Sequence, residues 1–479
     1  LFQLDIRETE TLETNFGGGD DTAVLVGNIL DEIALELDGG DGFDVLDLSQ
    51  LNPDVEVDIV NGTIGSATFQ NFERVIGTDG NDVFISDGVT EIDGGDGIDT
   101  VDFSKLDQGV NINLLQLGAD IDLGIGIAVE IAAAAEDPLE AEIAPEQITV
   151  NNVQNVENVI GTEFDDEIRS NNGDNTLRGL GGDDFLFGRG GRDVLIGGKG
   201  DDEVLGRNGN DLMIWNNGDG SDLLNGGQGD DTVQVNFNTD LVNEDLQNDD
   251  TARIEESADG ITFARTELNG QSVNGLFELD IRNTETLETN FGSGDDTAEI
   301  AGDVLDEIFL DLDGGDGVDT LDFSLASEDV RVDLTTGIIN PVLSSQAGSA
   351  LNFENVIGTD FDDTITGTDD ANVIDGGVGV DFISARSGDN TLTGGADQDV
   401  FVFTESDTGR DTITDFENGL DIVAIVSGPF DNASEVLDEL VAVDGGVELE
   451  FGSKTIFFEG AELGDFSEDD FFVDGILVL

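Results

Sequence analysis

The stretch GGKGDDEVLGRNGNDLMI, residues 197–214, contains two consecutive nonapeptides with one skeleton, a turn of glycines and acids followed by a short apolar step. Glycines at the first, second and fourth positions allow backbone conformations closed to other residues, so six residues can form a tight turn with its carbonyls directed inward. The sixth position is Asp, and the eighth is apolar between more polar neighbours, which is the alternation of a very short strand. Nine residues cannot bury that apolar face alone, so neighbouring copies must stack.

The nonapeptide recurs in two arrays. The first runs from Gly161 to Gln234, interrupted by two inserted residues at 215–216, and the second runs from Gly358 to Val402. A larger repeat relates residues 1–25 to residues 276–300, which are identical at 20 of 25 positions. We therefore expect stacks of short strands built from a duplicated unit. Isolated copies of the nonapeptide stand at 16–24, 39–47, 77–85, 94–102, 291–299 and 314–322.

The composition is strongly acidic. Lys and Arg total 16 against 109 Asp and Glu, which gives a formal charge of −93. This charge disfavours nucleic acid and anionic membrane surfaces as partners. Hydrophobic residues still make up 38% of the chain, with 29 Phe, which suffices for a core. The acids must then be offset by something other than Lys and Arg, and a hard divalent cation with oxygen ligands is the natural candidate.

Stacking makes the need for a cation specific. Parallel strands lie about 4.8 Å apart, so stacked turns bring carboxylates within roughly 5–10 Å of one another. Two unit charges about 5 Å apart repel by about 3 kcal/mol at an effective dielectric constant near 20. A cation between turns would convert the same acids into ligands. Calcium fits better than magnesium, because turn carbonyls suit roughly 6–8 irregular ligands and magnesium demands an octahedron.

Catalysis is not expected from this composition. The chain has no Cys and no His, which excludes disulfides, zinc–thiolate sites and nucleophiles that need a His base. A glycosidase or lyase that uses two carboxylates stays open from composition alone. Only three Lys are present (Lys105, Lys199 and Lys454), and no acid pair stands apart from the repeats. We therefore expect no enzyme within these residues.

The nonapeptide pattern G-G-x-G-x-D-x-U-x resembles that of the RTX (repeats-in-toxin) calcium-binding family. The resemblance covers most of residues 1–424, including the phrases NFERVIGT (71–78), NVENVIGT (155–162) and NFENVIGT (352–359). It implies an all-β fold of right-handed parallel β-rolls with two nonapeptides per coil and calcium between turns on the same edge. Further β segments and a C-terminal β cap complete the expected architecture.

The resemblance also implies the metal ligands. The cofactor is Ca2+ at multiple sites, and turn carbonyls would complete each one. Asn stands at the sixth position in Asn175, Asn372 and Asn390, where sites should be weaker or absent. Asp415 and Asp421 are further plausible ligands in the cap. The expected side-chain ligands are Asp21, Asp44, Asp82, Asp99, Asp166, Asp184, Asp193, Asp202, Asp211, Asp222, Asp231, Asp296, Asp319, Asp363, Asp381, Asp399 and Asp411.

The repeats divide the chain into six expected segments. The chain starts at Leu1, inside a copy of the large repeat, which predicts the C-terminal part of a longer polypeptide. The segments are a truncated β-roll module (1–118), an Ala/Glu-rich insertion (119–150), a nonapeptide β-roll (151–235), connecting β segments (236–290), the second large repeat with its β-roll (291–402), and a cap with a secretion signal (403–479).

The C-terminal sequence GDFSEDDFFVDGILVL (464–479) looks like the uncleaved signal of type I secretion substrates, and a last strand of the cap is the alternative. The resemblance therefore implies a secreted protein, extracellular or at the cell surface, that folds on extracellular calcium. Its expected partners are calcium ions and the type I secretion machinery. Self-association and a cell-surface polysaccharide are left open as further partners. We expect neither nucleic-acid binding nor membrane insertion.

Two biological roles compete at this point. The duplicated unit favours a structural component of the cell exterior, such as a surface layer, fibril or matrix. The alternative is the export and folding region of a secreted enzyme, toxin or adhesin whose active domain lies upstream.

Three details of the arrays can be predicted. Asp202 and Asp211 are nine residues apart, so they should fall on opposite edges of one coil, each sharing calcium with a turn eighteen residues away. The insertion at 215–216 predicts the weakest sites around Asp211 and Asp222, and Trp215 is expected to pack against a neighbouring element. Core positions at or beside the eighth position are expected for Phe84, Phe185, Phe382 and Phe401.

Overall fold

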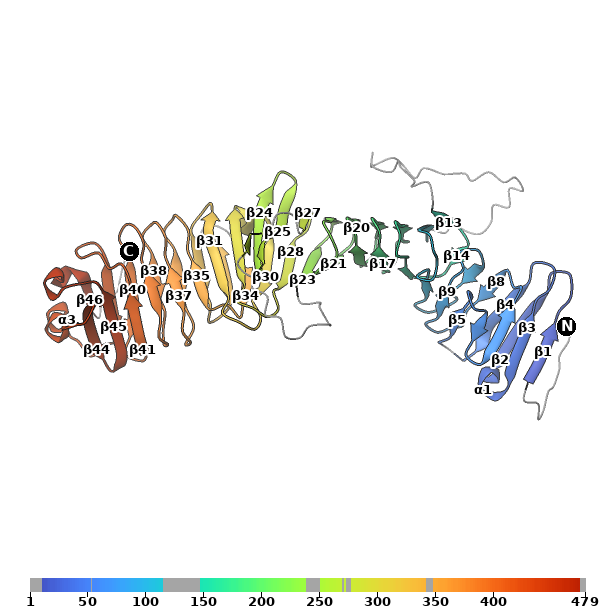
Figure 1. The fold of residues 1–479 in the computed structure, drawn as a ribbon, viewed down its shortest axis with the longest axis horizontal. Coiled ribbons are helices and arrows are strands. Elements are labelled where there is room, and N and C mark those ends of the chain that lie inside the picture. The colour runs from blue at the N-terminus through green and yellow to red at the C-terminus, as the bar shows by residue number, and fades with distance from the viewer. Residues whose placement is uncertain are drawn as a thin grey trace. The chain divides into compact units, whose positions relative to one another are not determined.

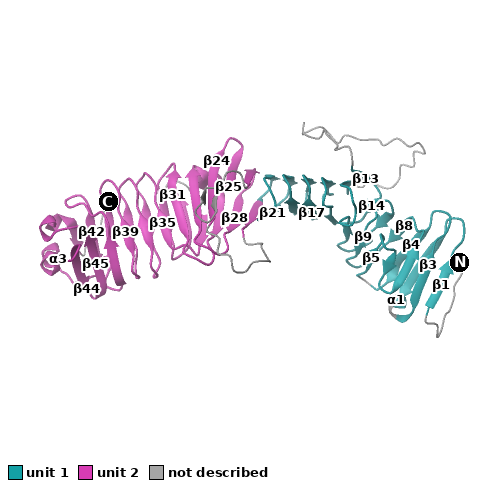
Figure 2. Ribbon diagram, in the orientation of Figure 1, with its two compact units in different colours: residues 1–231 teal, residues 232–479 magenta. Residues whose placement is uncertain are grey.

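The computed structural model describes residues 11–52, 54–114, 147–237, 250–268, 271–272, 277–341 and 348–473 (Figure 1). Most of the Ala/Glu-rich insertion predicted at 119–150, and the last six residues of the predicted secretion signal, lie outside these ranges. Contacts within the chain define two units, unit 1 (residues 1–231) and unit 2 (residues 232–479) (Figure 2). The predicted division into six segments stays a prediction.

In unit 1, most successive strands alternate between parallel sheets, as in a roll, and residues 56–70 form a short antiparallel segment within one sheet. The first sheet contains β1 (Thr11–Asn15), β3 (Ala34–Asp38), β5 (Glu56–Asp58), β6 (Thr63–Ile64), β7 (Ala67–Gln70), β9 (Val83–Ile85), β11 (Thr100–Asp102), β15 (Asn158–Ile160), β17 (Thr176–Gly181), β19 (Val194–Lys199) and β21 (Leu212–Asn216). The alternating strands are β2 (Thr22–Gly27), β4 (Val45–Leu51), β8 (Arg74–Ile76), β10 (Glu91–Asp93) and β14 (Val153–Gln154), then β12 (Val110–Asn113), β13 (Ile148–Val150), β16 (Glu167–Arg169), β18 (Phe185–Phe187), β20 (Glu203–Asn208) and β22 (Leu223–Gln228). One short helix, α1 (Ile29–Glu32), follows β2.

Unit 2 repeats most of this alternation, with antiparallel segments within residues 250–282 and 330–351, and ends in a cap with further antiparallel strands. One sheet contains β23 (Thr232–Asn236), β28 (Thr286–Asn290), β30 (Phe309–Asp313), β32 (Val330–Asp333), β33 (Ile338–Pro341), β34 (Gly348–Leu351), β36 (Thr364–Thr366), β38 (Phe382–Ser384), β40 (Val400–Thr404), β42 (Ile422–Val426) and β46 (Phe471–Val473). The other contains β24 (Asp250–Ser257), β25 (Gly260–Leu268), β26 (Gln271–Ser272), β27 (Glu278–Arg282), β29 (Thr297–Gly302), β31 (Thr320–Ala326), β35 (Asn355–Ile357), β37 (Val373–Asp375), β39 (Thr391–Thr393), β41 (Thr408–Ile413), β43 (Val441–Val443), β44 (Gly446–Phe451) and β45 (Ser453–Glu459). The helices are α2 (Val304–Glu307) and α3 (Ala433–Glu439), with single 3-10 turns at Leu463–Asp465 and Glu468–Asp470.

One coil of the roll contains two nonapeptides, as predicted. β17 pairs with β19 so that Thr176 lies opposite Val194, and β18 pairs with β20 so that Phe185 lies opposite Glu203. Equivalent residues on each sheet are therefore 18 positions apart, the spacing that the backbone-to-carboxylate hydrogen bonds also show. The fold is an all-β parallel β-roll.

The core consists of the eighth positions of the repeats. In the first array these side chains are at most 2% exposed, and they stack along the roll. They are Ile168, Leu177, Leu186, Leu195, Val204, Met213, Leu224 and Val233.

The prediction for the Phe side chains was right at two positions and wrong at two. Phe84 and Phe401 occupy eighth positions and are fully buried. Phe185 is 41% exposed and Phe382 is half-buried, because both stand at the seventh position and the strand turns them away from the core.

The glycines serve two different purposes. At the second and fourth positions, Gly198 and Gly200 have φ of +109° and +141°, conformations that favour glycine. At the first position the reason is space. A Cβ on Gly179 would lie 2.0 Å from Asp184 Oδ2, and one on Gly197 would lie 2.2 Å from Asp202 Oδ2. Backbone angles, from which all three glycines were predicted, therefore explain only the second and fourth positions, and close packing against the Asp carboxylate explains the first.

A matched pair of glycine substitutions tests this close packing. Gly209 has φ +144°, and a Cβ there would lie 1.5 Å from the Gly191 carbonyl oxygen, whereas Gly218 has φ +96° and open space around its Cα. We expect Gly209→Ala to cost about 4 kcal/mol or more, and Gly218→Ala roughly 1–2 kcal/mol. Urea unfolding in saturating calcium, followed by the emission of Trp215, the single Trp, measures both. Equal midpoints for the two variants would contradict the steric argument.

Trp215 packs inside the roll, as predicted. Its side chain is 1% exposed, and its Nε1 donates to the Gly220 carbonyl at 3.0 Å. The two inserted residues extend β21 and lead into a turn in which the Asp219 amide donates to the Asn216 carbonyl at 2.9 Å. The insertion is thus absorbed in a turn, and the strands on either side stay in register.

Candidate metal centres

The sixth-position acids form rows in which each carboxylate binds the backbone of the neighbouring coil. The Asp166 amide donates to Asp184 Oδ1 at 2.7 Å. The Asp184 amide donates to Asp202 Oδ1 at 2.8 Å, and the Asp202 amide continues the row to Asp222 Oδ1 at 2.9 Å. The β-roll therefore aligns carboxylates that are two repeats apart in sequence.

A second row lies on the other edge of the same array. The Asn175 amide donates to Asp193 Oδ1 at 2.8 Å, and the Asp193 amide to Asp211 Oδ1 at 2.9 Å. The Asp211 amide reaches Asp231 Oδ1 at 2.8 Å. Asp202 and Asp211 thus belong to different rows, as predicted. Since the bonds that span the insertion have ordinary lengths, the register shift on which the weaker sites at Asp211 and Asp222 were predicted is not seen, and the calcium affinity there stays a prediction.

Equivalent rows occur outside the first array. In unit 2 the Asp363 amide donates to Asp381 Oδ1 at 2.8 Å, and the Asp381 amide to Asp399 Oδ1 at 3.0 Å. Shorter rows join Asp21 to Asp44 at 2.7 Å, Asp82 to Asp99 at 2.8 Å and Asp296 to Asp319 at 2.7 Å. All of these predicted ligands are buried except Asp21, which is half-buried.

The second carboxylate oxygen of most row members lacks a hydrogen-bond donor. A buried carboxylate oxygen without a donor is costly, so each such atom calls for a cation or a proton. All of these atoms except Asp44 Oδ2 also lie against the first-position glycine of their repeat, where the absent side chain leaves room. Within the described residues, the Oδ2 atoms in this state belong to Asp44, Asp99, Asp184, Asp193, Asp202, Asp211, Asp319, Asp381 and Asp399.

The electrostatics of the rows agree with this need. Burial, reinforced by Asp166 and Asp202, raises the pKa of Asp184 to about 9. Burial likewise raises the pKa of Asp193 and of Asp222 to about 8. In unit 2, burial and neighbouring carboxylates raise the pKa of Asp381 and Asp399 to about 7. Without a cation, these folded rows therefore favour protonated carboxyl groups.

The donor set fits calcium if backbone oxygens take part. Among the described residues, no group of three or more acidic side chains is placed to hold a metal ion by itself. Each site would therefore combine one or two row Oδ2 atoms with carbonyl oxygens of the tight turns, a ligand set that calcium accepts.

Three predicted ligands stand apart from the others. The Thr78, Thr162 and Thr359 amides donate to Oδ2 of Asp82, Asp166 and Asp363 at 2.5, 2.6 and 2.6 Å. The Thr hydroxyls donate to Oδ1 of the same residues at 2.9, 3.0 and 3.0 Å. Both oxygens already have donors, and the pKa of Asp166 and Asp363 rises, by burial, only to about 6. Each of these acids starts a row.

The glutamates of the repeated phrase end the rows, a role that sequence reasoning missed. Glu73 Oε2 accepts from the Asp44 amide at 2.6 Å. Glu157 Oε2 accepts from the Asp99 amide at 2.9 Å, and Glu354 Oε2 repeats this contact with Asp319 at 2.8 Å. The signal was present in the sequence as the invariant third position of the three phrases at 71–78, 155–162 and 352–359.

The predicted ligands of the cap have partners of their own. Asp411 Oδ2 lies 2.6 Å from Lys454 Nζ. Asp415 accepts from the Gly394 and Gly395 amides at 3.0 and 2.8 Å. Asp421 accepts from the amides of Asp399 and Glu417 at 3.0 and 2.7 Å. This ion pair and these hydrogen bonds join the last coils to the cap.

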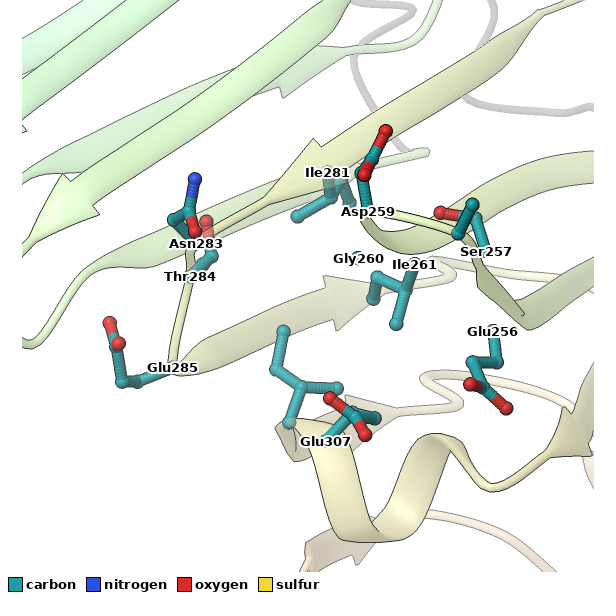
Figure 3. A pocket seen from close by; sticks show the side chains of 12 residues that line it. Glu256, Ser257, Asp259, Gly260, Ile261, Ile281, Asn283, Thr284, Glu285 and Glu307 are labelled. Atoms are coloured by element: carbon teal, nitrogen blue, oxygen red, sulfur yellow. The ribbon is translucent and has the colours of Figure 1, made fainter.

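A pocket in unit 2 lies away from the rows, between the β24–β25 hairpin and the turn at Glu307 (Figure 3). Its carboxylates are Glu256, Asp259, Glu285 and Glu307. The described lining contains neither an aromatic nor a basic side chain, so it offers no stacking platform for a sugar and no anion site.

Comparisons with known proteins agree with the geometry. A family model described as the RTX calcium-binding nonapeptide repeat (4 copies) matches residues 160–195, 179–213, 217–249, 357–392 and 377–404. The parallel coils, with Asp at the sixth position of most turns, define the class, a β-roll built from nonapeptides of the calcium-binding type. Residues 160–213, 217–249 and 357–404 therefore carry RTX calcium-binding nonapeptide repeats.

The other comparisons add little. The chain is similar to the crystal structure of extracellular lipase LipA from Serratia marcescens, with 16% identity over 64% of this chain and 39% of the lipase chain, at a TM-score of 0.18. So low a TM-score supports no inference about fold or activity. No curated protein matches the chain. In the part of the chain that the structure describes, no helix is long and apolar enough to cross a membrane.

Proposed function

We propose that the chain binds several calcium ions along its acid rows and folds on extracellular calcium after export by a type I secretion system. The observation that supports this proposal is the set of buried Oδ2 atoms without donors, such as those of Asp184, Asp193 and Asp381. These carboxylates recur at the spacing of one coil, so successive coils along a row add to the need for positive charge.

The acid rows couple this need to folding. Bound calcium supplies the positive charge that offsets the buried carboxylates. In the unfolded chain the same acids are dispersed in water and pay no desolvation cost. In a cytosol poor in calcium they repel one another and keep the chain unfolded, a state that can pass through a secretion channel. Outside the cell, ligands that exist only in the folded coil shift the equilibrium toward that coil.

For the biological role we propose a structural component of the cell surface or extracellular matrix, without enzymatic activity. The support is the near-identical large repeat at 1–25 and 276–300, since duplicated units are typical of assembling proteins. The absence of Cys and His from the sequence leaves few routes to catalysis. Self-association, or binding to a surface polysaccharide, would hold such a component at the cell exterior.

Electron microscopy and sedimentation of the purified chain, in calcium and in chelator, test this role. We expect ordered assemblies in calcium and dispersed chains in chelator. Magnesium at the same ionic strength is the control, and it should not support assembly. Calcium-dependent folding without assembly would contradict the structural role and favour the alternative, an export and folding region attached to an upstream enzyme, toxin or adhesin domain.

A further inference from the structure

The two edges of the second array differ in charge. One edge, here called the Asp edge, has Asp363, Asp381 and Asp399 at the sixth position. The other, the Asn edge, has Asn372, Asn390 and then Asp411. Both edges keep the same backbone register, since the amide of each residue donates to the next side chain of its row. The difference therefore lies in the side chains alone.

The amide groups of the Asn edge satisfy the oxygens around them. Asn372 Nδ2 donates to the Glu354 carbonyl at 2.7 Å. Asn390 Nδ2 donates to the Ser387 carbonyl at 3.2 Å and to Asp411 Oδ1 at 2.8 Å. On the Asp edge, Oδ2 of Asp381 and of Asp399 has no donor within the described residues. Carbonyl oxygens that could face a cation on the Asn edge thus accept N–H groups instead.

The Asn edge ends on a buried ammonium group. Lys454 lies in β45 of the cap, and its side chain is fully buried. Its Nζ lies 2.6 Å from Asp411 Oδ2, and it donates to the Arg386 carbonyl at 2.8 Å and to the Thr408 carbonyl at 3.3 Å. One carboxylate and two backbone carbonyls from neighbouring coils converge on this single positive charge. That is the ligand type expected of a calcium ion in the rows.

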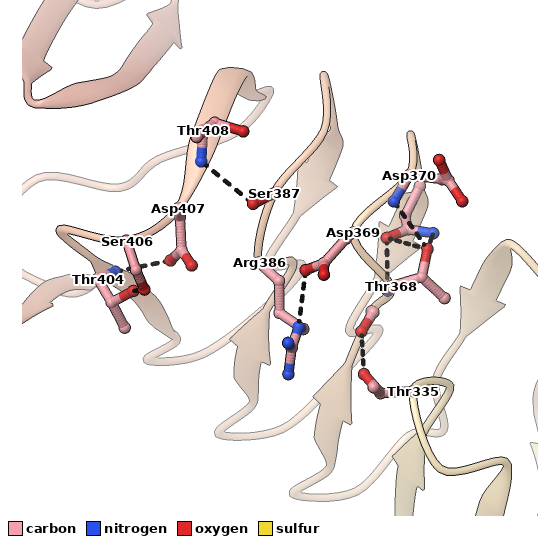
Figure 4. Close-up of polar contacts among 12 residues, drawn as sticks. Thr335, Thr368, Asp369, Asp370, Arg386, Ser387, Thr404, Ser406, Asp407 and Thr408 are labelled. Carbon is pink, nitrogen blue, oxygen red and sulfur yellow. Dashed lines mark hydrogen bonds and ion pairs between the residues drawn. The ribbon is translucent and has the colours of Figure 1, made fainter.

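A second positively charged side chain, that of Arg386, lies on the outside of the Asn edge. Arg386 occupies the turn before Asn390, and while its carbonyl accepts from Lys454, its side chain turns outward to Asp369 (Figure 4). The Arg386 Nε to Asp369 Oδ1 distance is 3.1 Å. This pair is exposed, so it contributes little energy. It nevertheless adds positive charge to the Asn edge, whereas the turns of the Asp edge contain no Lys or Arg.

We propose that the second array binds calcium along the Asp edge only, and that Lys454 occupies the cation position at the end of the Asn edge. This inference rests on the proposed calcium binding and adds its distribution. The last coil and the cap are then joined without metal through β41 and β45, which pair from Thr408 to Ile413. The cap can dock at low calcium and offer a preformed end on which the preceding coils stack.

Counting the calcium ions bound to the full chain, by elemental analysis after equilibrium dialysis in saturating calcium, tests the assignment. Asp399→Asn removes a carboxylate from the Asp edge, and we expect it to bind at least one ion fewer than the wild type. Asp411→Asn combined with Lys454→Met removes the matching carboxylate and its ammonium together. We expect this double variant to bind as many ions as the wild type. A loss equal to that of Asp399→Asn would overturn the proposal.

The reverse design should create a site. Asn390→Asp combined with Lys454→Met places two carboxylates in the row and removes the ammonium, so the count is expected to rise by at least one ion. Asn210→Asp adds the same charge at an exposed turn of the first array and should leave the count unchanged. Equal counts for the reverse design and the wild type would also overturn the proposal. A wild-type chain that binds no calcium would instead overturn the proposed function itself, so the two failures are distinguishable.

Discussion

Transfer of the chain from saturating calcium into excess chelator, at about pH 8, is expected to unfold both nonapeptide arrays, because the acids are ionised in the unfolded chain at that pH, whereas the folded rows must hold protons or bury uncompensated charge. Each bound ion contributes about 2.7 kcal/mol when free calcium is about 100 times its dissociation constant. Two such sites already match the lower end of the stability of a typical domain, about 5 kcal/mol. The rows hold more than two carboxylates whose Oδ2 lacks a donor, so the loss of calcium should exceed what packing can offset.

Two probes follow this unfolding. Far-UV circular dichroism should lose most of its β signal, and the emission of Trp215, which is 1% exposed in the folded roll, should shift to the red. Because each carboxylate binds the backbone of the adjacent coil, unfolding of one coil should spread to its neighbours along an array. Magnesium at equal ionic strength should fail to restore either signal. Equal β content with and without chelator would sink the proposal that calcium drives folding.

The periodic features of this fold could be predicted from sequence. A nine-residue spacing of apolar eighth positions determines which side chains face the core, so Leu186 and Leu195 follow from the pattern alone. The same spacing places Asp202 and Asp211 on different edges. Periodicity succeeds here because every coil contacts only its neighbours, and the local pattern is therefore also the tertiary pattern.

Features that depend on one atom's surroundings could not be predicted in this way. Phe185 and Leu186 are both apolar, and only the strand direction turns the first outward and the second inward. Asp166 and Asp184 have the same position in the repeat, yet the amide of Thr162 occupies Oδ2 of the first and not of the second. The list of predicted ligands therefore combined two kinds of carboxylate.

Contacts between residues that are distant in sequence could not be predicted either. Lys454 lies outside both arrays, and no spacing connects it with Asp411. The strand pairing of the cap brings the two together, with their charged atoms 2.6 Å apart. The rarity of Lys in the sequence does not indicate where a buried Lys is needed, because that location depends on the strand pairing of the cap.

Acidification of the calcium-free chain is expected to restore part of the roll that chelator removes. Burial raises the folded-state pKa of Asp184 to about 9 and of Asp193 to about 8, from the ordinary value of 3.8. At a pH between the ordinary pKa and the folded-state pKa, the folded state holds protons that the unfolded state has released. The free energy of unfolding therefore rises as pH falls through the folded pKa, is fully gained below the unfolded pKa, and is lost as pH rises again.

With calcium present, the pH dependence of the free energy of unfolding is expected to reverse, since protons and calcium compete for the same Oδ2 atoms. In chelator we expect more β signal at about pH 5.5, still above the pI of about 4.1, than at about pH 8. In a calcium titration we expect a higher midpoint at the lower pH. Asp184→Asn mimics the protonated group and should weaken both dependences, with Asp183→Asn, at the exposed neighbouring position, as the matched control. A calcium-free chain that is equally unfolded at both pH values would show that the row carboxylates do not control folding.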